Sequence, residues 1–233
     1  MYYLLFLYLR TKITDCNMVD KIIGRKVEQE ILRQRVESNN PELIAIYGRR
    51  RICKTFLVRQ YFKDTFNFYS TGIYQGTKRE QLGEFNRQLE YYSKRKWKLP
   101  KDWFDAFAQL REYMMSLGGN KPIVVFLDEL PWMDTPKSRF IKAFENFWNS
   151  YGATNNRLKF IVCGSATTWM SENVLSDKGG LYNRTTRSIY LAPFTLHETE
   201  KYLYLVLRSN GLYIYILGES VFVIVFCGNV EVS

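Results

Sequence analysis

Apolar residues along this chain gather in short runs that are separated by longer amphipathic stretches. The runs lie at residues 43–47, 66–70, 123–127, 159–163 and 188–191. The run at 123–127 has no polar interruption, which is typical of a strand buried on both faces. We therefore predict a strand at each of the five positions.

The stretches between these runs carry apolar residues three or four positions apart, which is the spacing of one helix face. They predict helices at residues 26–37, 54–62, 78–92, 103–117, 138–148 and 195–207. The last of these starts with Thr195 and has Glu198 three positions later, the pattern of a capping box. Strands that alternate with helices indicate an α/β fold with a central parallel sheet flanked by helices.

The first predicted strand leads into a loop that fits the phosphate-binding pattern G-x-x-x-x-G-K-[ST] at all but one position. We call it the phosphate loop; its residues are Gly48, Arg49, Arg50, Arg51, Ile52, Cys53, Lys54 and Thr55. In such a loop, backbone N–H groups at the start of a helix surround the phosphates. Lys54 would reach the β- and γ-phosphates of ATP, and the Thr55 hydroxyl would coordinate Mg²⁺. The position between a strand and a helix is the context that this motif requires.

Cys53 stands where the pattern has glycine. A Cβ atom at this point crowds the phosphates or strains a backbone conformation that glycine favours. The sequence leaves three alternatives open: weakened nucleotide binding, lost binding, and a reactive thiol at a helix N-terminus beside Lys54 and Arg51.

Two carboxylates follow the predicted strand at 123–127. Ligands of a parallel sheet lie at the carboxyl ends of its strands, so we expect Asp128 beside the phosphate loop, where it would hold Mg²⁺. Glu129 would act as the general base for the water that attacks the γ-phosphate. Without the phosphate loop upstream, an Asp-Glu pair would indicate no more than the end of a strand.

Ser165 follows the predicted strand at 159–163, and Arg184 lies in a basic turn after Gly179 and Gly180. The Ser165 hydroxyl would bind the attacking water or the γ-phosphate; capping of the next helix is the alternative. Arg184 would act as an arginine finger on this nucleotide or on that of a neighbouring molecule. A solvated basic turn explains Arg184 equally well.

The formal net charge of +10 favours anionic partners such as nucleotides and nucleic acids. Residues 94–98 alternate basic side chains with Trp97, and Trp103 follows, so this segment could stack on bases and contact phosphates. A solvated linker is the other interpretation of the same run.

The four cysteines are widely scattered and lack the spacing of a metal site or a disulfide framework, which favours a cytoplasmic location. Residues 2–9 are apolar but too short to span a bilayer, so no membrane partner is expected.

Composition changes at both ends of the chain. We expect residues 1–17 to be an extension from an upstream start, because Met18 precedes a plausible domain start. From Gly211 onward there is no Lys or Arg, and residues 221–226 form a bare β-prone run. We interpret residues 208–233 as an aberrant or truncated tail, with an ordinary buried strand as the alternative, and residues 18–207 as the main domain.

Taken together, these motifs resemble the archaeal-type AAA+ ATPases, a group close to the signal-transducing ATPases with numerous domains. The resemblance covers roughly residues 18–205 and rests on Gly24 and Arg25, the phosphate loop, the Asp128–Glu129 pair, Ser165 and the turn with Arg184. It implies a P-loop NTPase fold in which Gly24 and Arg25 lie near the adenine. It further implies that residues 48–55 are the Walker A motif, the Asp128–Glu129 pair is the Walker B motif, and Ser165 is at the sensor-1 position. The family usually has glycine at position 53 and continues into a helical lid and a winged helix.

We therefore predict an ATP-binding module with ATP and Mg²⁺ as ligands and with hydrolysis dependent on position 53. Two alternatives remain: a degenerate, non-hydrolysing fragment, and a nucleic-acid-binding protein that uses its basic surface. A protein partner and a homo-oligomer are compatible with each of the three.

Overall fold

The computed structural model describes residues 22–165, 167–176, 181–209, 213–217 and 220–224. The chain divides into two compact units, which are described separately. The larger unit consists of residues 27–192, and the smaller unit contains the residues on either side of that range. The predicted extension at 1–17 lies outside the described residues.

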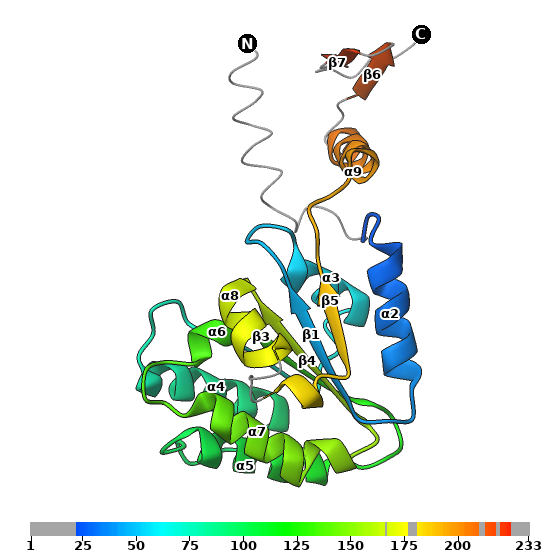
Figure 1. The fold of residues 1–233 in the computed structure, drawn as a ribbon. Coiled ribbons are helices and arrows are strands. Elements are labelled where there is room, and N and C mark those ends of the chain that lie inside the picture. Colours follow the sequence, from blue (N-terminus) through cyan, green and yellow to red (C-terminus); the bar gives the residue numbers. More distant parts are fainter. Residues whose placement is uncertain (1–21, 166, 177–180, 210–212, 218–219, 225–233) are drawn as a thin grey trace. The chain divides into compact units, whose positions relative to one another are not determined.

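A parallel sheet of five strands forms the centre of the larger unit (Figure 1). The strands are β1 (Glu42–Tyr47), β2 (Phe68–Thr71), β3 (Ile123–Asp128), β4 (Leu158–Gly164) and β5 (Arg187–Tyr190). Their order in the sheet is β2-β3-β4-β1-β5, so β4 lies between β1 and β3. All five predicted strands are present, and none of their ends differs from the prediction by more than two residues. The predicted parallel α/β fold is confirmed.

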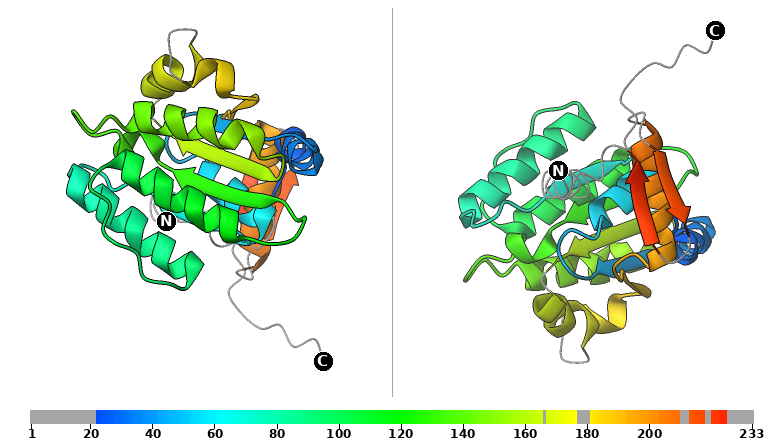
Figure 2. Two further views of the ribbon diagram at one scale, coloured as in Figure 1. Left: turned by 90° about the horizontal axis from the view of Figure 1, so that it is seen from below. Right: turned by 90° about the horizontal axis from the view of Figure 1, so that it is seen from above.

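Helices cover both faces of this sheet. They are α2 (Lys26–Glu37), α3 (Lys54–Phe62), α4 (Lys78–Ser93), α5 (Trp103–Ser116), α6 (Leu130–Met133), α7 (Phe140–Ser150) and α8 (Thr167–Met170). On one face lie α4, α5 and α7 (Figure 2). On the other face, Phe62 of α3 and Phe126 of β3 both pack against Phe66. The six helices predicted from apolar spacing are all present, the last of them as α9 (Leu196–Ser209) in the smaller unit.

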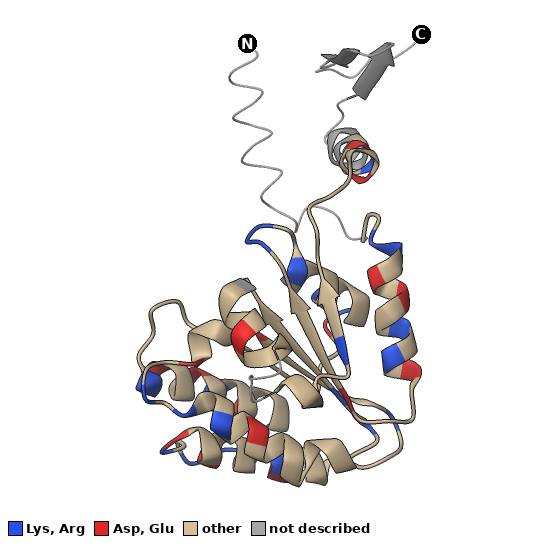
Figure 3. Cartoon of the chain, viewed as in Figure 1, with Lys and Arg blue, Asp and Glu red and all other residues tan. Residues whose placement is uncertain are grey.

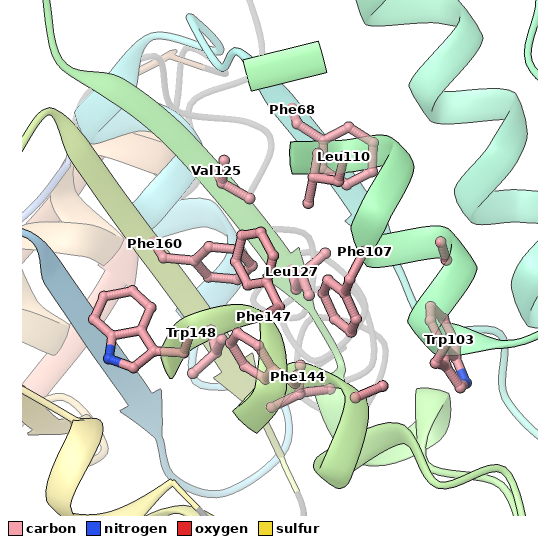
Figure 4. Close-up of a cluster of buried hydrophobic side chains, with 14 of the residues drawn as sticks. Phe68, Trp103, Phe107, Leu110, Val125, Leu127, Phe144, Phe147, Trp148 and Phe160 are labelled. Carbon is pink, nitrogen blue, oxygen red and sulfur yellow. The ribbon is translucent and has the colours of Figure 1, made fainter. Parts of the chain in front are cut away.

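Aromatic side chains fill the core between the sheet and α4, α5 and α7 (Figure 4). The Phe107 ring stacks on the rings of Phe144 and Phe147, with centroids 5.4 and 5.2 Å apart. Phe144 also contacts Phe160 of β4, with centroids 4.9 Å apart. These contacts fix α5 and α7 against the middle of the sheet, which sets the position of the strands that carry the site.

In the smaller unit, α9 begins with the predicted capping box. The Thr195 hydroxyl accepts a hydrogen bond from the Glu198 N–H at 3.2 Å, and a Glu198 carboxylate oxygen accepts one from the Thr195 N–H at 3.0 Å. Beyond it, β6 (Tyr213–Leu217) and β7 (Ser220–Ile224) pair antiparallel, so the β-prone run at 221–226 is a strand as far as it is described. No helix among the described residues is long and apolar enough to cross a membrane.

The core contacts of Phe144 generate a stability prediction. Phe144→Ala removes a ring that is fully buried between Phe107 and Phe160. We expect the free energy of unfolding to fall by about 3–5 kcal/mol in chemical denaturation. Tyr91→Ala is the control, because Tyr91 is 63% exposed, and it should change the value by less than about 0.5 kcal/mol. Equal losses in both variants would contradict this description of the core.

Candidate functional site

The phosphate loop and the acidic pair lie at the same edge of the sheet. The loop begins where β1 ends, Asp128 ends β3, and Ser165 directly follows β4 between them. Carboxyl ends of parallel strands share one edge, so three segments that are far apart in the sequence meet here. The arginines of the loop give this edge a basic rim (Figure 3).

The backbone of the phosphate loop has conformations that L-residues rarely adopt. Gly48 has φ +147°, and a Cβ atom there would lie 2.4 Å from the Leu191 carbonyl oxygen, so only glycine fits. Arg51 and Cys53 both have φ 63°, in the left-handed region. Cys53 thus adopts, at the start of α3, a conformation that glycine favours, at a cost of about 1 kcal/mol.

Lys54 is buried inside this loop. Its side-chain ammonium donates hydrogen bonds to the Gly48 carbonyl at 3.1 Å and to the Arg49 carbonyl at 2.7 Å. Both acceptors are neutral backbone groups, so the positive charge of Lys54 is available to an anion that enters the loop.

Thr55 and Asp128 connect the phosphate loop to β3. The Thr55 hydroxyl donates a hydrogen bond of 2.7 Å to the Asp128 carboxylate. Asp128 is only 4% exposed and also accepts hydrogen bonds from the Glu129 N–H and from the Cys163 thiol. Burial raises the pKa of Asp128, and the hydrogen bond from Thr55 opposes that shift. A buried carboxylate beside a hydroxyl is the oxygen-donor chemistry that Mg²⁺ prefers.

Glu129 and Ser165 face each other across the ends of β3 and β4. The Ser165 hydroxyl donates to the Glu129 carboxylate at 2.8 Å, and the Ser165 N–H lies 3.4 Å from the same oxygen. Ser165 therefore orients the Glu129 side chain, a role that the sequence analysis did not consider.

The contact between Cys163 and Asp128 was also missed from the sequence. Cys163 lies on β4 two residues before Ser165, and burial raises the pKa of its thiol well above its ordinary value. The thiol therefore stays protonated and acts as a hydrogen-bond donor. The sequence did contain a signal for this contact. Side chains alternate between the two faces of a strand, so residues 163 and 165 were expected on the same side of β4.

Arg184 lies away from these groups. It precedes β5, and the first residue of β5, Arg187, is paired with Ile44 near the start of β1, at the opposite edge of the sheet from the phosphate loop. Its guanidinium contacts Glu145 and Asn149 of α7, each at 2.8 Å. The structure does not bring Arg184 together with the phosphate loop of its own chain.

Gly24 and Arg25 belong to the smaller unit. The Arg25 N–H donates to the Glu198 carboxylate at 3.1 Å, and the Arg25 guanidinium lies 4.5 Å from the centroid of the Phe194 ring. Gly24 has φ +66°, and a Cβ atom there would lie 2.5 Å from the Glu198 carboxylate. Their proximity to an adenine ring stays a prediction.

The basic segment at 94–98 differs from the surface that the sequence suggested. Arg95 pairs with Glu112 at 2.7 Å and Lys96 with Glu90 at 2.8 Å, so two of its cations are neutralised within the chain. Trp103 is completely buried in the core and cannot stack on a base.

Comparisons with known proteins identify a family and several similar proteins. A family model described as an ATPase domain predominantly from Archaea matches residues 23–204. Two proteins of Methanocaldococcus jannaschii are similar in sequence. The uncharacterized protein MJECL04 is 26% identical over 180 residues, which are 77% of this chain and 38% of that protein. The uncharacterized ATP-binding protein MJ0423 is 38% identical over 42 residues, which are 18% of this chain and 71% of that protein.

Two solved structures share the fold. The Walker-type ATPase PABY2304 of Pyrococcus abyssi has a TM-score of 0.59 and 19% identity, over 82% of this chain and 59% of that one. The ORC2 protein of Aeropyrum pernix, in complexes with ADPNP and ADP, has a TM-score of 0.56 and 17% identity, over 86% of this chain and 55% of that one. The chain thus spans little more than half the length of these neighbours and about two fifths of MJECL04.

The burial of Asp128 generates a prediction about stability. Asp128→Asn keeps the shape of the side chain and one acceptor oxygen. It removes a carboxyl group whose ionised form is disfavoured by burial. Without nucleotide and in the presence of a chelator at neutral pH, we expect Tm to rise by about 2–4 °C, which corresponds to about 1 kcal/mol.

The sign of the effect depends on pH. The folded-state pKa of Asp128 is raised, so the destabilisation appears as pH rises from the unfolded-state pKa to the folded-state pKa and is constant above it. The advantage of Asp128→Asn should therefore disappear in acid. Glu172→Gln changes an exposed carboxylate that forms no hydrogen bond or ion pair with a described residue, and it should leave Tm nearly unchanged at neutral pH. A lower Tm for Asp128→Asn than for the wild type at neutral pH would contradict this account.

Proposed function

Since the chain belongs to the family of ATPase domains found predominantly in Archaea, we propose that its larger unit binds ATP with Mg²⁺ at the carboxyl edge of the sheet. The observation that carries the proposal is the 2.7 Å hydrogen bond between Thr55 and the buried Asp128, next to a lysine buried in the phosphate loop. A hydroxyl and a carboxylate in contact, with an ammonium group beside them, match the parts of a nucleotide phosphate site. The descriptions of MJ0423 as ATP-binding and of ORC2 in complexes with ADPNP and ADP support the same ligand.

In this proposal the residues of the loop have separate tasks. Lys54 exchanges the Gly48 and Arg49 carbonyls for the β- and γ-phosphate oxygens, and the N–H groups at the start of α3 bind the phosphates. Thr55 and Asp128 would hold Mg²⁺, and the bound metal would neutralise charge on the phosphates and orient them. The fit of the metal rests on Asp128, a carboxylate with 4% exposure whose hydrogen-bond donors among the described residues include no cationic side chain.

The proposal extends to hydrolysis of the bound ATP. Glu129 accepts a proton from water, the water oxygen bonds to the γ-phosphorus, and the bond from phosphorus to the bridging oxygen breaks to release ADP. Both hydrogen bonds from Ser165 go to one oxygen of the Glu129 carboxylate, so the other oxygen can accept the proton while Ser165 holds the side chain in place. Ser165 is thereby a positioning residue for the proposed base.

A module that binds ATP without hydrolysing it is the second candidate. Cys53 favours it, because a side chain at φ 63° in this loop adds strain next to the phosphates. The two candidates differ in turnover and agree on ATP as the ligand.

Other parts of the proposal rest on sequence and family. The ATPase domain is assigned to residues 18–207, in keeping with the family match at 23–204. Gly24 and Arg25 are assigned to the adenine, and Arg184 to a neighbouring molecule's nucleotide in a homo-oligomer. A cytoplasmic location stays a prediction from the sequence. The chain covers 38% of MJECL04, so these assignments are made for this ATPase module and for neighbouring copies of it.

Binding of Mg²⁺-ATP by the wild type, Lys54→Ala and Cys53→Gly tests the proposal. In calorimetric titration in a reducing buffer, we expect the wild type to bind. Lys54→Ala loses charge-assisted hydrogen bonds and should bind about 30–100-fold more weakly. Cys53→Gly removes the Cβ atom and thiol that crowd the phosphates and should bind about fivefold more tightly. The proposed ligand would be wrong if neither the wild type nor Cys53→Gly bound ATP.

Glu129→Gln separates hydrolysis from binding. Loss of the general base should lower the rate of phosphate release by about 100-fold or more, while the affinity for ATP stays within about twofold. The Cys53→Gly background serves for the comparison if the wild type turns over too slowly to measure. Equal rates with and without the Glu129→Gln substitution would remove the assigned base, and absence of phosphate release in both backgrounds would favour the non-hydrolysing candidate.

A further inference from the structure

A pocket of about 400 Å³ opens beside the phosphate loop. It is lined by Arg50, Arg51, Tyr74, Glu129 and Trp132. These residues come from the loop, from the segment after β2 and from the end of β3 with α6. Neither Tyr74 nor Trp132 has a task in the proposed binding of ATP.

Two aromatic rings form one wall of this pocket. The rings of Tyr74 and Trp132 meet edge to face with centroids 5.3 Å apart, and Tyr74 is 58% exposed. The buried Gln81 holds the two segments in place: its amide donates to the Trp132 carbonyl at 2.9 Å and to the Ile73 carbonyl at 2.7 Å, and accepts from the Ile73 N–H at 2.9 Å. These hydrogen bonds hold the backbone of the two segments together, so both rings stay on the same wall of the pocket.

Two guanidinium groups face the same pocket. The Arg50 guanidinium lies 5.7 Å from the Tyr74 centroid and 5.8 Å from the Trp132 centroid. Arg50 and Arg51 are exposed, and neither forms an ion pair with a described residue. Several other arginines are neutralised in the chain, as Arg59 is by Asp64 and Arg95 is by Glu112.

We propose that this pocket binds one nucleotide unit of a single-stranded nucleic acid, with the base on Tyr74 and Trp132 and the phosphate on Arg50 and Arg51. Aromatic stacking next to unpaired cations is the combination by which single strands are bound without sequence readout. An acidic peptide would use the arginines but leave the two rings exposed. The volume suits one nucleotide, and the net charge of +10 attracts the strand. Glu129, the acidic residue in the lining, is already hydrogen-bonded to Ser165.

The pocket proposed here is additional to the ATP site, and its binding of a strand is tested in the absence of ATP. Fluorescence anisotropy of a labelled oligothymidylate of about 15 nucleotides is measured with the full chain, in a chelator and at low salt. Tyr74→Ala and Trp132→Leu should each weaken binding about tenfold. Tyr91→Ala is the matched control: Tyr91 is 63% exposed and its ring also lies beneath a cation, with the Lys94 ammonium 4.2 Å from the centroid. It should change the affinity by less than about twofold.

The salt dependence tests the arginines. Loss of one phosphate contact lowers the slope of log affinity against log salt by about 0.7 for a single strand, so we expect this change in Arg50→Gln. Arg95→Gln is its control, because Arg95 also stacks on a ring, that of Trp97, with 3.7 Å between the guanidinium and the centroid. Its slope should equal that of the wild type.

Several outcomes overturn the proposal. These are absence of binding by the wild type at low salt, wild-type affinity in Tyr74→Ala, and a loss in Tyr91→Ala that equals or exceeds the loss in Tyr74→Ala. Full competition by an acidic peptide would identify a protein partner instead, and full competition by free thymidine monophosphate would identify a mononucleotide pocket. Tyr74 is exposed, so its variant keeps the test decisive even if Trp132→Leu does not fold. Strand binding that persists in a chain unable to bind ATP would refute the proposed function alone, and the reverse result would refute this inference alone.

Discussion

The hydrogen bond between Thr55 and Asp128 joins the phosphate loop to β3, and the rest of the site is arranged around it. The two residues come from the start of α3, which follows β1, and from the end of β3, and β4 lies between these two strands in the sheet. A carboxylate with 4% exposure is unfavourable unless its oxygens are hydrogen-bonded, and Thr55, the Glu129 N–H and Cys163 supply the donors. The sheet thereby maintains a buried anionic group at the edge where the phosphate loop opens.

Lys54, Asp128 and Glu129 each have neutral hydrogen-bond partners within the chain. Lys54 binds backbone carbonyls of its own loop, Asp128 binds a hydroxyl and a thiol, and Glu129 binds Ser165. Hydrogen bonds to neutral groups are weaker than those between opposite charges. A phosphate group and a divalent cation can therefore replace these partners with a net gain, which is the physical basis of the proposed affinity for ATP.

The basic side chains at the surface fall into two groups. Arg59, Arg95 and Lys96 are paired with carboxylates and stabilise local structure by small amounts. Arg50 and Arg51 have no such pairs among the described residues and stand next to two aromatic rings. A net charge of +10 by itself selects no partner, whereas these two arginines indicate a binding surface at one edge of the sheet.

The sequence by itself determined the local elements: the strands and helices, the phosphate loop, the capping box of α9 and the acidic end of β3. These depend on residue spacing over a few positions, and each was found within two residues or so of its predicted bounds. Only the tertiary structure decided the strand order, the contact of Ser165 with Glu129, the burial of Trp103, the position of Arg184 at the far edge of the sheet, and the meeting of Arg50 with Tyr74 and Trp132. The physical reason is that strand pairing and side-chain contacts join residues that are many positions apart, and periodicity along the chain carries no information about which of them meet.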